Sequence, residues 1–460
     1  MTSIRRSKRS LARCLLVPFF ASLAACSEGS APVAPAEVRA TSGGGQTAPV
    51  QTMLPAPLVA TVVDEGGNPV RGITVNWDAG GAGRVDPASS TTDGEGRAAA
   101  RWMLGEETGI ENALATVSDL PPATFSAVAE PPDAIPLGEI RVLSLPTYEG
   151  SGQVVHPDYV RSPVGAFAHG HHLAITPYPF GNANYENPSL FASLGKRDAW
   201  LLEPGAPNPI VRPKSGHLSD PDVVYVPESN ELWLYYRQAT DYNVVLLTRS
   251  ADGRRWSEPV EVARRPSHEI VSPTVVRKSA SEWYMWAVNS GPSGCGASSA
   301  RVELRRSTDG ERWSEPEPLD FPLPDLWPWH VEVQWMSSRN EFWAVFNAKT
   351  KSGCTTPAVF IARSPDGVEW TVTGRPVIAK GRIPEFEHIV YRSTFDYDPA
   401  ADIVTFWYSG ARYVGTDYVW GAAVERRPRE EVFAAVETTM NAAMDAAIYH
   451  PPPAPLREWP

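Results

Sequence analysis

The chain has 460 residues, with 45 Pro, 35 Gly, 16 Trp and a formal net charge of −12. So many helix-breaking residues argue against a helical bundle or a coiled coil, and the negative charge argues against nucleic-acid binding. The length and the 42% hydrophobic content predict two or three domains with large cores, not a disordered chain.

Residues 1–25 have the pattern of a signal peptide. A basic stretch precedes an apolar run that is too short to span a bilayer, and the run ends in Leu23-Ala24-Ala25-Cys26. This tetrapeptide resembles the bacterial lipobox, which implies that Cys26 is acylated; an ordinary signal peptide with a chance cysteine is the alternative. Residues 26–40 are then a flexible tether. We therefore expect a lipoprotein of the bacterial cell envelope, in the outer membrane or at the cell surface, that contacts the membrane only through its lipid anchor.

Residues 41–130 are predicted to form a small β module. Short alternating runs, such as 58–63 and 73–77, are separated by turn residues about every ten positions, which favours a β-sandwich. The segments 63–72, 75–77 and 91–96 resemble the bacterial Ig-like domain of the invasin and intimin type. The resemblance implies a spacer or adhesion module without catalysis.

Residues 137–427 contain an internal repeat. Ser250, Ser307 and Ser364 recur every 57 residues, each followed by x-Asp-Gly and then by Trp, and a worn copy begins at Ser193. Asp-Gly favours a tight hairpin turn, and Ser and Asp side chains bond turn amides, so we expect a structural role. The turns resemble the Asp-box of sialidases and other sugar-active propellers.

Aromatic strands precede these turns and divide the segment into five units of three or four strands each. Units of this size are typical of propeller blades. The last unit lacks an outer strand, which residues 139–145 are expected to supply, and residues 428–460 are predicted to be a helical and Pro-rich tail. The predicted fold is all-β: an Ig-like β-sandwich, a five-bladed β-propeller and a short C-terminal helix. The expected blades are 156–213, 217–265, 268–320, 328–379 and 386–427.

Five of the nine histidines fall where the innermost strand of each blade is expected to start: His156, His217, His268, His330 and His388. Acidic residues follow in three blades: Asp158, Asp220 and Glu332. Strand alternation places His156 with Asp158, and His330 with Glu332, on one face. Because innermost strands start near a propeller axis, we expect these side chains to surround one central funnel.

This pattern resembles the five-bladed glycosidase superfamily that includes glycoside hydrolase families 43 and 32. The resemblance implies that Asp158 is the base or nucleophile, Asp220 stabilises the transition state, and Glu332 is the general acid. Converging carboxyl groups raise one another's pKa, as glycoside cleavage requires. The chain departs from these families in having no clear Asn-Asp-Pro-Asn or Glu-Cys signature. The alternative is that the two aspartates cap turns and Glu332 pairs with an arginine.

We expect a carbohydrate partner and no nucleic acid. The candidate sugar contacts are His156, His217, His330, His388, Trp327 and Trp329, although the two tryptophans also suit a core. Imidazoles suit transition metals, but the histidine spacing is irregular, so no cofactor is predicted and an axial metal ion is the alternative. We predict an exported, monomeric lipoprotein whose function is to hydrolyse glycosidic bonds of a poly- or oligosaccharide. The alternative is a non-catalytic glycan-binding or adhesion lipoprotein.

Cys295 and Cys354 are predicted to form a disulfide. Both follow Ser-Gly and lie in similar positions of adjacent repeats. Export to an oxidising compartment would favour the bridge.

Overall fold

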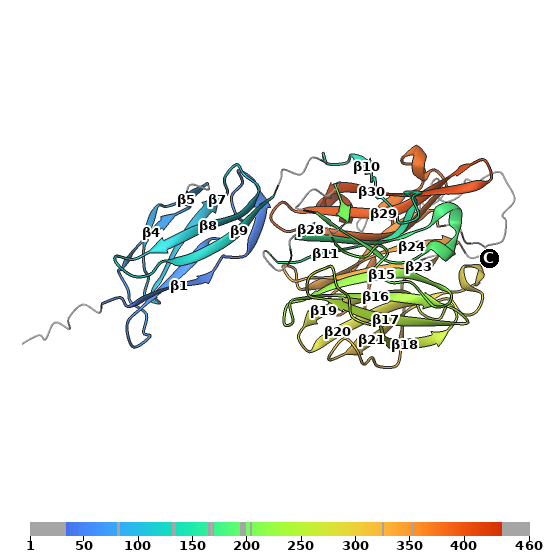
Figure 1. Cartoon of the computed structure of the whole chain (residues 1–460), viewed down its shortest axis with the longest axis horizontal. Helices are drawn as coiled ribbons and strands as arrows, with labels where there is room; N and C mark the ends of the chain where they lie inside the picture. Colours follow the sequence, from blue (N-terminus) through green and yellow to red (C-terminus); the bar gives the residue numbers. More distant parts are fainter. Residues whose placement is uncertain are drawn as a thin grey trace, which may run out of the picture.

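A computed structural model describes residues 34–434, except for 81–82, 131–134, 164–166, 168–169, 194–198, 203–204, 324–325, 351–353 and 355. The described residues form thirty strands, four short 3-10 turns and one short α-helix. Figure 1 shows two lobes, which we call the N-terminal module (37–130) and the five-sheet body (140–428). The predicted signal peptide, Cys26 and the tail beyond 434 lie outside the described residues.

The N-terminal module consists of two sheets that share one core. Along β7 (Arg97–Met103), Ala98, Ala100 and Trp102 are buried while alternate residues are exposed, as expected for a strand with one face against a core. Trp77 and Phe125 of the opposite sheet belong to the same buried cluster. The module begins at β1 (Glu37–Ser42), so residues 37–40 of its first strand lie in the stretch predicted as tether. The sheet orders are β1-β3 (Leu58–Val63)-β7-β5 (Arg84–Asp86) and β2 (Gln46–Pro49)-β9 (Ala123–Glu130)-β8 (Gly109–Thr116)-β4 (Thr74–Asp78)-β6 (Ser89–Thr91).

The five-sheet body contains five sheets, four of which follow the chain in simple order. The first has β11 (Val154–Arg161), β12 (His171–Pro177), β13 (Ser189–Ser193) and β14 (Leu201–Leu202). The second has β15 (His217–Val226), β16 (Glu231–Ala239), β17 (Tyr242–Ser250) and β18 (Val260–Pro266). The third has β19 (Val271–Ser279), β20 (Glu282–Asn289), β21 (Arg301–Ser307) and β22 (Glu317–Leu319). The fourth has β23 (Leu326–Met336), β24 (Glu341–Thr350), β25 (Ala358–Ser364) and β26 (Thr371–Val372), and β27 (Ile378–Ala379) also pairs with β25.

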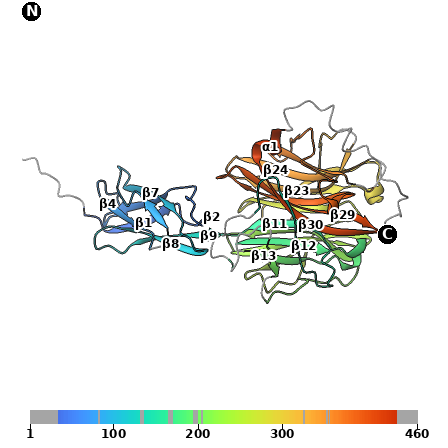
Figure 2. The same ribbon diagram turned by 90° about the horizontal axis from the view of Figure 1, so that it is seen from above.

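The fifth sheet combines the two ends of the body. It has the order β10 (Ile140–Val142), β30 (Asp417–Pro428), β29 (Ile403–Val414), β28 (Ile389–Asp398). Strand β10 pairs antiparallel with β30, from Ile140 opposite Glu425 to Val142 opposite Ala423, which confirms the predicted strand donation. In Figure 2, β30 lies beside β11, although these two strands come from opposite ends of the body.

The first strands of the five sheets contact one another in succession. Strand β11 contacts β15, β15 contacts β19, β19 contacts β23, β23 contacts β28, and β28 contacts β11. The five strands therefore surround a common centre, and the predicted site residues lie near the starts of these strands. A short helix, α1 (Arg429–Phe433), follows β30 and packs Phe433 against Trp343, with ring centroids 4.7 Å apart. Among the described residues, no helix is long and apolar enough to cross a membrane.

The repeated Ser-x-Asp-Gly turns tie neighbouring sheets together. In the fourth sheet, the Asp366 carboxylate accepts the backbone N–H groups of Val368 and Glu369. Gly367 has a φ of +79°, and its carbonyl oxygen accepts the indole N–H of Trp286, from the third sheet, at 3.0 Å. The turn is thus a structural contact between sheets.

Replacing Gly367 with Ala should destabilise the body by about 2–4 kcal/mol, because the residue would be strained at positive φ and overpacked. An added Cβ would lie 2.7 Å from the Trp286 ring. Gly381→Ala is the matched control, since Gly381 has the same φ of +79° but no atom within 4 Å of the added Cβ. Urea unfolding of both variants measures the difference, and equal losses would contradict the packing argument.

Candidate functional site

A β-bulge occurs near the start of each first strand and shapes the centre of the body. The register shifts between Val155 and Asp158, between Ser219 and Asp222, and at similar places in β19, β23 and β28. In three strands the bulge begins with a residue that precedes proline and has positive φ: His156 (56°), Asp220 (52°) and Ser272 (51°). Proline disfavours a right-handed helical residue before it, and a bulge re-aims side chains.

The bulges bring together His156, Asp220 and His330, which we call the His–Asp–His cluster. The Asp220 Oδ1 lies 3.5 Å from the His156 Nε2 and 3.2 Å from the His330 Nδ1. All three side chains are buried, and one ligand atom from each lies within 4.8 Å of the others. Within the described part of the chain, these three atoms have no aligned hydrogen-bond partner. Buried polar atoms are nearly always bonded, so three converging atoms of this kind fit a shared ligand.

Neighbouring groups fix the charge and orientation of this cluster. The His156 Nδ1 shares a hydrogen bond of 3.0 Å with the Thr176 hydroxyl, so its Nε2 faces Asp220. Burial lowers the pKa of both His156 and His330 below the ordinary value, which favours neutral imidazoles. Burial alone would raise the pKa of Asp220, but Arg237 at 2.7 Å and the two histidines outweigh it and hold that pKa well below its usual range. Two neutral imidazoles and a carboxylate are ligands that divalent transition metals prefer.

A second group of acids forms the lower cluster: Asp158, Asp222 and Glu332. Their closest carboxylate oxygens also lie within 4.8 Å of one another. Arg392 lies among them, with its Nη2 3.2 Å from Glu332 and 3.9 Å from both aspartates. Burial raises the pKa of Glu332 well above its ordinary value, and the negative charges of Asp158 and Asp222 raise it further. The guanidinium supplies positive charge 3.2 Å from Glu332, and its Nη1 also lies 3.9 Å from the Asp220 Oδ1, so Arg392 borders both clusters.

The lower cluster also holds the first strands together. The Asp158 carboxylate accepts the backbone N–H of Val223 at 2.6 Å, and the Asp222 carboxylate accepts that of Val275 at 3.0 Å. The hydroxyls of Thr274 and Thr394 accept the N–H groups of Val333 and Tyr159 in the same way. These bonds join β11 to β15, β15 to β19, β19 to β23 and β28 to β11. Asp158 and Asp222 therefore help to hold neighbouring first strands together.

Glu186 lies beside the His–Asp–His cluster and was not predicted from the sequence. It follows the short turn Ala183–Tyr185, and its side chain is buried with its Oε2 3.9 Å from the His217 Nε2 and 4.0 Å from the His156 Nδ1. Burial and the negative charge of Asp220 raise the pKa of Glu186 well above its ordinary value. His217 is a quarter exposed, and burial together with Arg237 lowers its pKa to about 4. Glu186 lies in a loop, where no periodic pattern of residues could have indicated that it faces the site.

The residues predicted to form one funnel fall into two neighbouring clusters that share Arg392, whose Nη1 lies 3.9 Å from Asp220 and whose Nη2 lies 3.9 Å from Asp158. Asp220 lies with His156 and His330, whereas Asp158 and Glu332 lie in the lower cluster. The five histidines are not equivalent, because His217 precedes the bulge residue Asp220 by three positions, while His156 is itself the bulge residue.

The remaining predicted contacts surround the two clusters at different depths. The His388 ring lies 4.8 Å from that of Tyr413, and its Nδ1 accepts the Tyr413 backbone N–H. The Trp329 indole donates to the Tyr391 hydroxyl at 3.0 Å and packs against His330, whereas Trp327 packs against a hydrophobic core.

The structure contains the predicted disulfide between Cys295 and Cys354, with the Cα atoms 4.8 Å apart. The bridge joins segments that follow β20 and β24, in the third and fourth sheets. It therefore links two neighbouring sheets at one end of the body.

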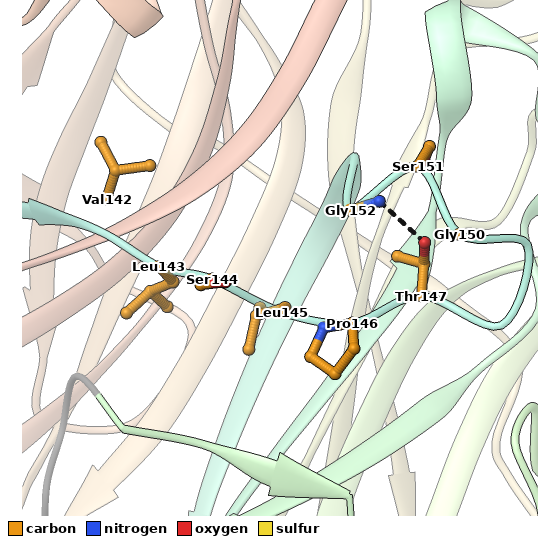
Figure 3. Close-up of a pocket in the computed structure, with 9 residues that line it drawn as sticks. All are labelled: Val142, Leu143, Ser144, Leu145, Pro146, Thr147, Gly150, Ser151 and Gly152. Carbon is orange, nitrogen blue, oxygen red and sulfur yellow. Dashed lines mark hydrogen bonds between the residues drawn. The ribbon is translucent and has the colours of Figure 1, made fainter.

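A separate cavity of about 470 Å³ lies along the segment that connects β10 to β11 (Figure 3). The backbone N–H of Gly152 donates to the Thr147 hydroxyl at its edge. The nine described residues that line the cavity carry no titratable side chain, so it offers no groups for acid, base or metal chemistry. The buried clusters are the better candidates for a reactive site.

Comparison with known proteins gives one sequence relative and several similar folds. No protein-family model matches the chain. The A type blood N-acetyl-alpha-D-galactosamine deacetylase of Flavonifractor plautii is 29% identical over 308 residues, which cover 56% of this chain and 40% of that protein. The chain therefore spans less than half the length of this relative.

Solved structures match part of this chain. An N-acetylgalactosamine deacetylase from F. plautii, in complex with blood group B trisaccharide, matches with a TM-score of 0.60 and 24% identity. The match covers 65% of this chain and 98% of that one. A thermostable family-43 glycoside hydrolase matches with a TM-score of 0.42 and 10% identity, over 63% of this chain and 90% of that one. The chain thus shares the fold of the deacetylase structure over 65% of its length.

Proposed function

We propose that the five-sheet body hydrolyses the N-acetyl group of an amino sugar within a glycan, with the help of a divalent metal ion. The observation that carries the proposal is the His–Asp–His cluster, whose buried ligand atoms converge without an aligned hydrogen bond to any described residue. The likeness to a deacetylase supports the choice of an acetamide as the group attacked. We further propose that the five sheets form a closed five-bladed propeller, that the N-terminal module is an Ig-like sandwich, and that the protein is an envelope lipoprotein.

Three residues would hold the ion: His156, Asp220 and His330. An ion bound there supplies Lewis-acid polarisation of a carbonyl oxygen. Three protein ligands leave coordination positions open, as in catalytic rather than structural sites. Thr176 fixes the orientation of His156, and Arg237 holds Asp220 ionised from the side opposite the histidines.

Glu186 is placed to transfer protons in this reaction. Its raised pKa suits a carboxyl group that takes a proton from the attacking water and gives one to the leaving nitrogen near neutral pH. Water adds to the acetamide carbon, the carbon–nitrogen bond breaks, acetate leaves, and the sugar keeps a free amine. His217, a quarter exposed and 3.9 Å from Glu186, would position that carboxyl group.

Glycoside cleavage through Asp158 and Glu332 has less support. The Asp158 carboxylate is bonded to a strand amide, and Glu332 faces Arg392. Burial does not distinguish the two sites, because the side chains of both clusters are buried. Glycan binding without catalysis would not need the converging ligand atoms of the His–Asp–His cluster.

The test offers the purified protein a panel of oligosaccharides with N-acetylhexosamine ends and measures acetate and new reducing ends separately. Acetate without new reducing ends supports deacetylation. New reducing ends without acetate would replace the proposal with glycoside hydrolysis. Glycan binding with neither product would support a binding module.

Chelation should remove the activity. We expect dialysis against EDTA to lower acetate release at least about 100-fold and one divalent metal to restore it, because the ion polarises the reacting carbonyl. Restored metal should also raise the melting temperature, since an ion at 100 times its Kd stabilises the folded state by about 2.7 kcal/mol. Activity that survives exhaustive chelation would contradict a metal-assisted reaction.

A further inference from the structure

We propose that the projecting tip of the β29–β30 hairpin, residues 412–418, is a second sugar-binding subsite, with Tyr413 as its stacking platform. The inference deepens the proposed function and rests on it for the position of the reacting sugar. It assigns the site an oligosaccharide substrate, of which one sugar enters the His–Asp–His cluster and a neighbouring sugar stacks on Tyr413.

The β29–β30 hairpin extends beyond the neighbouring strand of its own sheet. Strands β29 and β30 have 12 residues each, whereas β16 and β17 have nine each in the second sheet. Strand β28 pairs with β29 only as far as Ala411, while β29 and β30 remain paired up to Val414 and Asp417. Within the described residues, the tip therefore extends beyond its neighbouring strand, and residues 412–417 are exposed.

Aromatic rings make this tip rigid. Tyr413 stacks on Tyr418 with centroids 4.1 Å apart, and their hydroxyls share a hydrogen bond of 2.6 Å. His388 meets the Tyr413 ring edge-on at 4.8 Å. Tyr413 nevertheless remains 37% exposed. A fixed aromatic side chain offers contact area at low cost in conformational entropy, with a polar hydroxyl at its end.

The rings continue from the tip to the proposed metal ligands. Tyr418 lies 5.9 Å from Trp420, Trp420 lies 5.3 Å from Tyr391, and Tyr391 lies 4.4 Å from His330. Each step is between ring centroids. The tip also extends past Ile389, the start of β28, at the end of the body where the first strands begin, so the occupant is taken as a further part of the same substrate.

A second exposed ring lies on the same wall. Phe180 is 60% exposed, and its φ of 54° is unfavourable for a residue with a side chain. Its backbone N–H and that of Trp420 both donate to the Gln153 side-chain oxygen, at 3.1 and 3.0 Å. The turn that carries Phe180, Pro179–Gly181, contacts β30. A strained backbone that presents an apolar ring to solvent is consistent with a ligand contact.

The chemistry of the tip suits a sugar. An aromatic face packs against the apolar face of a sugar ring, and the exposed side chains of Arg412 and Asp417 can bond its hydroxyls. A protein partner would require a larger apolar surface than the two exposed rings provide.

The experiment compares Tyr413→Ala and Tyr413→Phe with the unchanged protein, using a trisaccharide with a terminal N-acetylhexosamine and the methyl glycoside of that sugar. We expect Tyr413→Ala to weaken trisaccharide binding and raise its KM roughly tenfold, because one aromatic contact is lost. The methyl glycoside should be unaffected, and Tyr413→Phe should keep most of the affinity. Tyr242→Ala is the control. It removes a tyrosine of the second sheet that is 49% exposed, and it should leave the affinity for both ligands unchanged.

Binding measured by calorimetry separates this inference from the proposed function. If the trisaccharide binds in a Tyr413-dependent way but no acetate is released, the subsite stands and deacetylation fails. The subsite would be overturned if Tyr413→Ala weakened the binding of both ligands equally. It would also be overturned if this variant kept both its trisaccharide affinity and a normal melting temperature. The inference also fails if the unchanged protein binds the two ligands equally well.

Discussion

Replacing Asp220 with Asn should abolish metal binding and lower kcat/KM for deacetylation by at least about 100-fold, more than the loss of an outer-shell partner. Asp220 is the anionic member of the His–Asp–His cluster, and its Oδ1 faces both histidines. Asparagine keeps the shape but loses the charge. It also leaves Arg237 without its closest counter-ion, so stability should fall by about 3–5 kcal/mol.

Asp222→Asn is the matched control for this variant. Asp222 lies two residues further along the same strand and is equally buried, but it belongs to the lower cluster. We expect it to lower stability and to leave the metal content unchanged. Metal analysis by mass spectrometry, kcat/KM and melting temperature together separate the two effects. Full metal content in Asp220→Asn, or its loss in Asp222→Asn, would show that the ligand set is misassigned.

Glu186→Gln should lower kcat by about 10²- to 10⁴-fold while the metal remains bound, because the variant cannot carry the transferred proton. Glu186 is buried at the edge of the His–Asp–His cluster, beside the partly exposed His217. Metal analysis and steady-state kinetics on one N-acetylated oligosaccharide test the prediction. A variant with normal kcat would exclude Glu186 as the proton-transfer group.

Glu332→Gln provides the contrast. Glu332 is also buried with a raised pKa, but it lies in the lower cluster beside Arg392. A protonated carboxyl group and an amide have the same shape, so the deacetylase proposal expects little change in activity. The glycosidase hypothesis expects a loss of at least about 100-fold, as for a general acid. The pair of glutamates therefore distinguishes the two reactions.

The repeat and its turns could be predicted because their causes are local. The Asp-Gly dipeptides require positive φ at glycine, and Gly253, Gly310 and Gly367 all have it. The strand donated by 139–145 followed from an unpaired last unit, and β10 pairs with β30 as expected. The alternation in 73–77 likewise indicated a strand with one buried face, and Val75 and Trp77 of β4 are buried while their neighbours are exposed.

Histidines and acids could be assigned to the starts of the innermost strands from the sequence, but which of them meet depends on the folded structure. Strand alternation assumes a period of two, and a bulge inserts an extra residue that breaks it. As a result His156 meets Asp220, from the neighbouring sheet, while Asp158 meets Asp222 and Glu332. Glu186 reaches the site from a loop whose position depends on how five sheets pack around one centre. No periodicity within the chain encodes that packing, so only the folded structure could place it.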